Sequence, residues 1–330
     1  MKTSLIITTI NKLNKNLKNF DKLSHDKNWN FIVIGDKKSP KNFNLKYGKY
    51  YNLLKQKRTN IKFAKACPEH NYARKNIGYL LAIKNNSDVI IETDDDNYPK
   101  KNFFENKKLI HKCSEINNKD WINIYDLFTN SKTLVWPRGL PLSHVKKNKI
   151  KLTKKISKEF YIQQGVCEKN PDVDAIYRLI NDKINIKFKQ NYYVSLGNSY
   201  SPFNSQNTIW FKKAFPLMYL PVTCSMRSTD IVRGLIALRI MNNDKKNILF
   251  FGTSMFQNRN EHNLYKDFEG EIPIYLHTKK ILNLLFRLKL KKGFKNYLDN
   301  LMKCYTLLIL NGLIKKKEIV YLKKWIIEFK

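Results

Sequence analysis

The stretch that decides the fold runs from Asn71 to Pro99 and reads NYARKNIGYLLAIKNNSDVIIETDDDNYP. Residues 71–84 place apolar side chains at helical spacing, and a Ser-Asp pair then ends the pattern. Residues 89–92 form an apolar run of strand length, and three aspartates, Asp94 to Asp96, follow shortly after it. The stretch therefore predicts a helix, a buried strand and an acidic strand end.

Two earlier segments have the same character as this strand. Residues 4–9 and 30–35 (NFIVIG) are apolar runs, and the polar amphipathic stretch 11–23 lies between them. Alternating helices and continuously apolar strands are typical of a parallel sheet covered on both faces. Ligands bind such sheets beyond the carboxyl ends of the strands. We therefore expect Thr8–Asn11, Asp36 and the aspartate triplet to converge on one crevice.

The remainder of the chain is less regular until its last third. Residues 121–127, 192–196 and 206–210 are expected to be extended, and residues 229–241 are expected to be helical. After Gly270 the chain is rich in Leu, Ile and Lys at helical spacing. These patterns predict one α/β domain over residues 1–275 and a C-terminal helical region over residues 276–330.

The composition limits the class of protein. Apolar residues make up 42% of the 330 residues, which indicates a globular chain in spite of a formal net charge of +35. Such a charge favours phosphate-bearing partners. However, lysine and asparagine are spread along the whole chain, and no segment interleaves basic residues with stacking aromatics. We therefore expect no nucleic-acid partner.

Other segments bear on the compartment. The five cysteines are far apart and form no CxxC pair, so neither a zinc site nor a disulfide framework is indicated. No apolar run reaches the roughly 18–20 residues of a membrane-spanning helix. The N-terminal MKTSLIITTI resembles a first strand more than a signal peptide. The expectation is a cytoplasmic protein, either free or peripheral at the inner face of a membrane.

The aspartate triplet allows two interpretations, an acidic turn or a cation site. In an extended chain Asp94 and Asp96 point to the same side, with Cα atoms about 7 Å apart. Two such carboxylates can share Mg²⁺ or Mn²⁺, which accepts substrate phosphates at its other positions and neutralises a diphosphate leaving group. Because the triplet ends a buried strand at the expected crevice, we predict the cation site.

Several later motifs accompany this stretch. In chain order they are WPRGLPL, QQGVCEKNPDVDAIYRL, SQNTIWF, PVTCSMRSTDIVRG and QNRNEHNLYKDFEGE. Together with residues 71–99 they resemble the STELLO-type glycosyltransferase-like family, over roughly residues 1–275. A weaker similarity, carried by the aspartate triplet, PDVDAIYRL and the later Arg-x-x-Asp-Ile segment, points to the reversibly glycosylated polypeptides, which include nucleotide-sugar mutases.

This resemblance implies a GT-A fold, in which a Rossmann-like nucleotide-binding half with a mixed central sheet joins an acceptor half. It implies that Asp96 binds the metal directly and that Asp94 contacts the ribose or a metal-bound water. It further implies nucleotide contacts for Thr8, Thr9, Asn11, Asp36, Arg74, Lys75 and Asn76. Cations and helix N-terminal amides suit phosphates, although Arg74 and Lys75 could instead form a solvated helix face.

Asp230 is the candidate catalytic carboxylate. In an inverting reaction it would act as the general base that deprotonates the acceptor hydroxyl. Alternatively it is a first-turn carboxylate that favours the helix dipole. Arg227 and Arg233 would hold phosphate or pair with Asp230.

Three further polar residues have open roles. His262 is a candidate third metal ligand or diphosphate contact, with a structural histidine as the alternative. Asp172 and Asp174, in the PDVDA segment, either contact sugar hydroxyls or cap a helix.

The leading hypothesis is a metal-dependent glycosyltransferase that moves a sugar from a nucleotide sugar, a UDP-sugar, to a glycan or lipid-linked acceptor. The alternatives are a nucleotide-sugar mutase or self-glycosylating protein, and a non-catalytic scaffold with a GT-A fold. Residues 281–298 combine Leu, Ile and Phe with lysines. This segment either rests on an anionic membrane or docks to complete the core.

Overall fold

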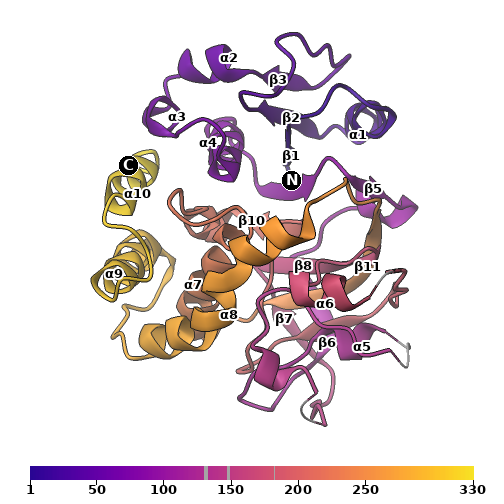
Figure 1. Ribbon diagram of the computed structural model, residues 1–330, viewed down its shortest axis with the longest axis vertical. Helices are drawn as coiled ribbons and strands as arrows, with labels where there is room; N and C mark the ends of the chain where they lie inside the picture. Colours follow the sequence, from indigo (N-terminus) through magenta and orange to yellow (C-terminus); the bar gives the residue numbers. More distant parts are fainter. Residues whose placement is uncertain (130–132, 147–148, 182) are drawn as a thin grey trace.

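The structure, a computed structural model, describes residues 1–129, 133–146, 149–181 and 183–330. Its sheet has helices on both sides (Figure 1). The strands are β1 Thr3–Thr9, β2 Asn30–Gly35, β3 Lys49–Tyr51, β4 Val89–Asp94, β5 Asn97–Pro99, β6 Ile110–Glu115, β7 Ile156–Glu159, β8 Ile162–Lys169, β9 Tyr193–Ser195, β10 Asn207–Phe211 and β11 Leu249–Gln257. They follow the order β3-β2-β1-β4-β10-β8-β11-β9-β6-β7, and β5 pairs with β11.

Helices pack around this sheet. They are α1 Lys15–Asp26, α2 Leu53–Lys57, α3 Lys62–Ala66, the short 3₁₀ helix η1 Tyr72–Arg74, α4 Lys75–Lys84, α5 Tyr125–Phe128, α6 Ala175–Ile180, the 3₁₀ helix η4 Lys212–Met218, α7 Thr229–Asn243, α8 Leu264–Phe286, α9 Tyr297–Leu310 and α10 Glu318–Ile327.

The N-terminal half of the sheet is parallel, as its apolar strands predict. β1 lies between β2 and β4, and its register pairs Thr9 with Gly35 and Thr8 with Asp94, so the three carboxyl ends are level. Helix α4 covers β1 and β2 at close range. A Cβ atom at Gly78 would lie 2.5 Å from Cγ2 of Ile6, so this approach requires glycine.

The second half makes the sheet mixed. β10 is antiparallel to both β4 and β8, and β11 is parallel to β8. This confirms the predicted α/β fold of GT-A type with C-terminal helices. The strand expected at 121–127 was wrong: Tyr125–Phe128 forms the short helix α5, and Trp121 makes only an isolated bridge to Tyr200. A short apolar run does not distinguish the two by periodicity.

The C-terminal helices pack against the domain. Helix α10 packs on α3, and α9 packs on α7 and η4. The indole of Trp325 is fully buried, with its ring 5.7 Å from that of Tyr219. Glu318, at the start of α10, accepts the backbone N–H groups of Val222 (2.9 Å) and Thr223 (2.7 Å). These helices therefore contribute to the core.

The domain boundary expected at 275/276 falls inside the continuous helix α8. Within the part of the chain that the structure describes, no helix combines the length and the apolar character needed to cross a bilayer.

Candidate functional site

Two strand ends are joined through Asp95. Its Oδ2 accepts hydrogen bonds from the Thr9 hydroxyl (2.5 Å) and from Nδ2 of Asn11 (2.9 Å). The middle aspartate thus holds the end of β1 against the turn that follows β4. Thr9 and Asn11, expected at the nucleotide base, face this carboxylate, and Thr8 is half-buried beside them in β1. Their nucleotide contacts stay predictions.

The third strand end is fixed by Asp36, directly after β2. Its two oxygens accept the backbone N–H groups of His70 (3.0 Å) and Asn71 (2.9 Å). The carboxylate thereby ties the end of β2 to the segment that leads into η1 and α4. The expected nucleotide contact of Asp36 stays a prediction.

Asp96 lies in the turn between β4 and β5 and is only 8% exposed. Its Oδ2 accepts from Nε2 of Gln257 (2.9 Å) and from the backbone N–H of Asn260 (3.3 Å). Its Oδ1 is buried and has no hydrogen-bond partner among the described residues. Burial, together with the charges of Asp94 and Asp95, raises the pKa of Asp96 to about 6. An unsatisfied buried carboxylate oxygen is costly, and it suits a cation ligand.

Asp94 has a different environment from Asp96. Its Oδ1 accepts from Nζ of Lys75 (2.9 Å) and from the Tyr72 hydroxyl (2.8 Å), and its side chain is 29% exposed. The Lys75 side chain is fully buried and also donates to the Thr93 carbonyl (2.8 Å). Lys75, expected at the nucleotide phosphates, therefore neutralises one of the three aspartates.

Arg74 and Asn76 are committed to the fold. The Arg74 guanidinium is 1% exposed and donates to Oε1 of Gln56 and to the Cys67 carbonyl (2.9 Å). The Asn76 amide exchanges two hydrogen bonds with the backbone of Leu220, at 2.8 and 2.9 Å. Neither side chain is brought to the aspartate triplet, and their nucleotide contacts stay predictions.

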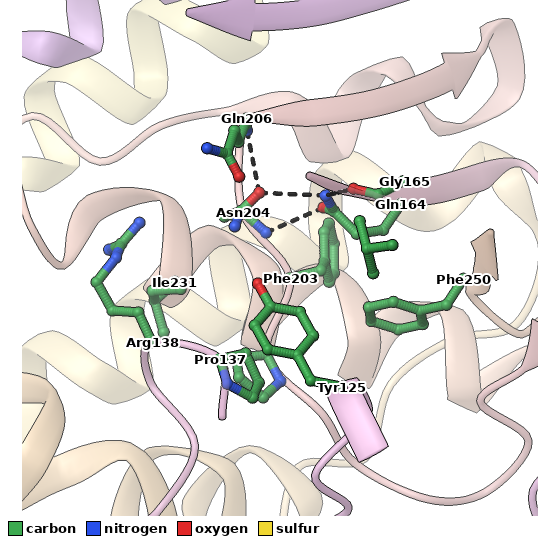
Figure 2. Close-up of a pocket in the computed structure, with 12 residues that line it drawn as sticks. Tyr125, Pro137, Arg138, Gln164, Gly165, Phe203, Asn204, Gln206, Ile231 and Phe250 are labelled. Atoms are coloured by element: carbon green, nitrogen blue, oxygen red, sulfur yellow. Dashed lines mark hydrogen bonds between the residues drawn. The ribbon is translucent and has the colours of Figure 1, made fainter. Parts of the chain in front are cut away.

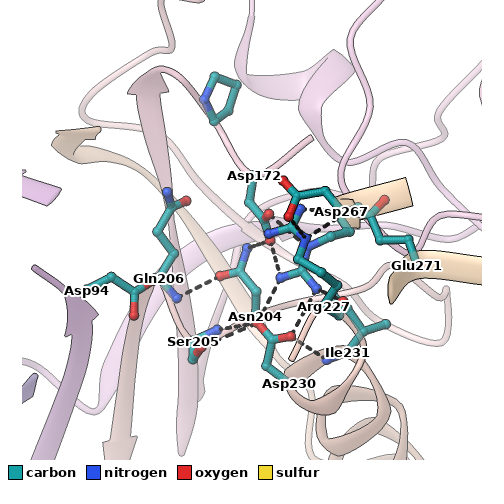
Figure 3. Close-up of polar contacts among 12 residues, drawn as sticks. Asp94, Asp172, Asn204, Ser205, Gln206, Arg227, Asp230, Ile231, Asp267 and Glu271 are labelled. Atoms are coloured by element: carbon teal, nitrogen blue, oxygen red, sulfur yellow. Dashed lines mark hydrogen bonds and ion pairs between the residues drawn. The ribbon is translucent and has the colours of Figure 1, made fainter. Parts of the chain in front are cut away.

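Asp230, at the start of α7, belongs to a second group of polar residues (Figure 3). Both of its oxygens accept from the Arg138 guanidinium, at 3.0 and 2.9 Å. The same guanidinium makes two hydrogen bonds to Asp172, at 2.9 and 2.8 Å. Burial would lower the pKa of Arg138, but the Asp172 and Asp230 carboxylates raise it well above its usual value. The side chain of Arg138 is thus a charged bridge between two buried aspartates.

Sequence reasoning assigned no role to Arg138. Its only signal is the WPRGLPL motif, in which Pro and Gly indicate a structured loop. A small cavity lies beside this residue and the hydrogen-bonded side chains of Gln164, Asn204 and Gln206 (Figure 2). Its volume of about 10 Å³ has room for about one water molecule and not for a sugar.

The two groups of carboxylates are connected. The Ser205 hydroxyl lies 2.6 Å from the Tyr72 hydroxyl, and the backbone N–H of Ser205 donates to Oδ2 of Asp230 (3.3 Å). Tyr72 also donates to Asp94. A continuous hydrogen-bonded path therefore runs from the triplet to the candidate catalytic carboxylate.

A buried ion pair joins the helix that carries Asp230 to the strand that carries Asp94. Arg233 lies one turn after Asp230, and its guanidinium pairs with Glu92 at 2.8 Å. Glu92 lies two residues before Asp94 and also accepts from the Trp210 indole (2.8 Å). Arg233 therefore pairs with Glu92, and not with Asp230 as one of the sequence alternatives had it.

The capping alternative holds for Asp174, and His262 contacts Asp267. Asp174 caps α6 by accepting the backbone N–H of Tyr177 (2.8 Å). His262 places Nδ1 3.4 Å from Oδ1 of Asp267. Within the described residues, no three or more His, Cys, Asp or Glu side chains are grouped so that they could hold a metal ion. The metal-ligand role of His262 stays a prediction.

The chain has sequence relatives among known proteins. No family model matches it. It is 29% identical over 236 residues to the protein named "Probable glycosyltransferase STELLO2" of Arabidopsis thaliana, a match that covers 65% of this chain and 31% of the relative. It is 28% identical over 234 residues to "Probable glycosyltransferase STELLO1" of the same organism, with 64% and 30% covered. The chain thus matches less than a third of the length of these relatives. These matches confirm the resemblance seen in the motifs: the chain is a homologue of the STELLO-type glycosyltransferase-like proteins.

Proposed function

We propose that this chain is a metal-dependent glycosyltransferase that moves a sugar from a nucleotide sugar, most simply a UDP-sugar, to a glycan or lipid-linked acceptor. The names of the two relatives support the transferase class. The observation that carries the proposal is the buried Oδ1 of Asp96, which no described residue pairs, beside Asp94 at the carboxyl end of a central strand.

The residues at the triplet fit a divalent cation. Asp96 would hold Mn²⁺ or Mg²⁺, with Asp94 beside it, and the cation would neutralise the diphosphate as it leaves. Lys75 and Tyr72 hold the Asp94 carboxylate in one orientation. Asp95 fixes the β1 end, so the turn that carries Asp96 is positioned before any ligand arrives.

Asp230 is the proposed general base for the acceptor hydroxyl. Besides the two hydrogen bonds from Arg138, Oδ1 of Asp230 accepts from the Ile231 N–H and Oδ2 accepts from Ser205, so an acceptor hydroxyl would have to displace Ser205 to reach the carboxylate. Arg138 orients Asp230 through two hydrogen bonds.

The test is a panel of nucleotide sugars with Mn²⁺, read by melting temperature and by hydrolysis without acceptor. We expect Mn²⁺-dependent stabilisation and slow hydrolysis with at least one UDP-sugar, both lost in Asp96→Asn and both kept in Asp26→Asn, an exposed carboxylate on α1. Asp230→Asn should bind normally but fail to transfer the sugar. Absence of both turnover and melting shift would refute the transferase, and a ring-form change in the recovered UDP-sugar would identify the mutase.

A further inference from the structure

The outer side of α8 carries a row of exposed apolar side chains, which we call the α8 stripe: Tyr265 (76% exposed), Phe268 (36%), Ile272 (39%) and Leu276 (67%). Successive members are three or four residues apart, so they lie on one side of the helix. The other side of α8 packs on α6, α7 and α9. Large apolar side chains that are exposed together, and not scattered singly, indicate a contact surface.

The apolar residues in the second half of α8 are placed differently. Ile281, Leu282 and Leu285 belong to the segment 281–298, which by sequence either rests on a membrane or completes the core. All three are buried, so they contribute to the core. The exposed apolar surface of α8 therefore lies mainly in the stripe, closer to the start of the helix.

Lysines accompany the stripe. The exposed charged residues of α8 are three lysines and one acid, namely Lys266, Lys279, Lys280 and Glu269. The two other acids of the helix, Asp267 and Glu271, are buried and pair with Arg259 and Arg227. They therefore do not offset the lysines at the surface, and the exposed side of α8 is both apolar and positively charged.

A neighbouring loop extends this surface. Nζ of Lys279 lies 3.4 Å from the Ser143 hydroxyl, and Ser143 follows Leu142, which is 42% exposed. Lys146, three residues further along the chain, is also exposed. The loop thus brings one more apolar side chain and one more lysine toward the C-terminal end of the stripe.

The stripe begins close to the aspartate triplet. The backbone N–H groups of Asn258 and Asn260 donate to Asp96, and α8 starts a few residues later with Asn263 as its cap. Tyr265 therefore lies in the first turn of a helix whose preceding segment holds the proposed metal ligand. Figure 1 shows α8 leading from the end of β11 across the outside of α7. A surface that covers the stripe would lie near the proposed donor site.

An anionic lipid surface matches both properties of the stripe and its surroundings. On such a surface an amphipathic helix inserts its apolar side chains among the acyl chains, while lysines meet the anionic headgroups. A second copy of this chain matches less well. It carries the same lysines and a formal net charge of +35, so self-association would bring like charges together.

We propose that the α8 stripe docks the protein on an anionic lipid surface. The docking itself needs neither a metal nor a nucleotide sugar. One consequence rests on the proposed transferase function: of its two acceptor classes, the lipid-linked one would be presented beside the donor site.

The experiment co-sediments the full chain with vesicles of equimolar phosphatidylglycerol and phosphatidylcholine, and with vesicles of phosphatidylcholine alone, without metal or nucleotide. We expect binding to the anionic vesicles. Tyr265→Ser combined with Leu276→Ser should weaken this binding about tenfold or more, because two apolar side chains no longer enter the lipid. Lys279→Gln combined with Lys280→Gln should weaken it about tenfold on the anionic vesicles only.

Matched controls separate the stripe from general attraction between a basic protein and anionic lipid. Val320→Ser with Ile327→Ser removes two exposed apolar residues of α10, and Lys315→Gln with Lys316→Gln removes two exposed lysines just before that helix. Because these positions do not belong to the stripe, each control should bind within about twofold of the wild type.

Equal losses in the stripe variants and their controls would reduce the contact to general charge attraction and overturn the proposal, as would unchanged binding in the α8 variants. Dimers in analytical ultracentrifugation that Tyr265→Ser with Leu276→Ser abolishes, without vesicle binding, would assign the stripe to a second copy. The same variant should keep the Mn²⁺-dependent hydrolysis of the UDP-sugar. Vesicle binding through the stripe by a wild type that hydrolyses no nucleotide sugar would refute the transferase and leave the docking surface standing.

Discussion

Two groups of buried carboxylates lie at the centre of this molecule, and they differ in how completely their charges are paired. Asp172 and Asp230 share the Arg138 guanidinium, and Asn204 adds a hydrogen bond of 2.7 Å to Asp172. In the triplet, Lys75 pairs with Asp94, while Oδ1 of Asp96 has no partner among the residues described. Breaking a satisfied buried network is costly, whereas an unsatisfied carboxylate itself costs stability. The first group supports the fold, and the second keeps capacity for a ligand.

The largest effect that would test this contrast is the loss of Arg138. Arg138→Met leaves two buried carboxylates without their cation, and we expect the free energy of unfolding to fall by about 3–5 kcal/mol. Urea denaturation measures this change. Arg287→Met, at an exposed position, should change it by less than about 0.5 kcal/mol. A variant as stable as the wild type would show that Asp172 and Asp230 are not held by this bridge.

Asp96→Asn should act in the opposite direction. Because burial raises the pKa of Asp96 to about 6, its ionised form destabilises the fold above that pH, and the penalty fades as the pH falls toward the ordinary aspartate value. At pH 8, with a chelator present to remove metal ions, the free energy of unfolding of the variant should exceed that of the wild type by about 2 kcal/mol. The gain should vanish near pH 4. Equal stability of the two proteins at pH 8 would mean that Oδ1 of Asp96 is satisfied.

The smallest effect is expected for Asp267, a carboxylate that pairs with Arg259 and Arg227. Burial would raise its pKa, but the His262 hydrogen bond and the Arg227 and Arg259 charges lower it to about 2. A lowered pKa stabilises the fold above the ordinary aspartate pKa and loses this contribution as the pH falls toward 2. Asp267→Asn should therefore cost about 1 kcal/mol at pH 7, after allowance for solvent screening. Acid titrations of both proteins should converge at low pH, and a constant difference would exclude this ion-pair origin.

The N-terminal half of the sheet was predictable because its signals are local. β1, β2 and β4 are continuous apolar runs, and their shared direction follows from the helices between them. The aspartate triplet was therefore correctly placed at a strand end. The orientation of Lys75 was not predictable, because a helix-start lysine meets a phosphate or a carboxylate depending on the tertiary neighbour.

The group formed by Asp172 and Asp230 could not be assembled from the sequence. Arg138 and Asp230 are 92 residues apart, and the PDVDAIYRL motif, which contains Arg178, does not identify the spatial neighbours of that residue. Their pairing depends on how β8, β10 and α7 pack, which no local periodicity encodes. The WPRGLPL motif marked the loop but not the charge that it carries inward.

The docking of α10 sets an order of events during synthesis. The Glu318 carboxylate accepts hydrogen bonds from the backbone N–H groups of Val222 and Thr223, which lie only a few residues before Asp230. Translation must therefore extend almost a hundred residues past this segment before its backbone donors find their acceptor. Until then the backbone N–H groups of Val222 and Thr223 lack the Glu318 carboxylate that accepts them in the complete fold.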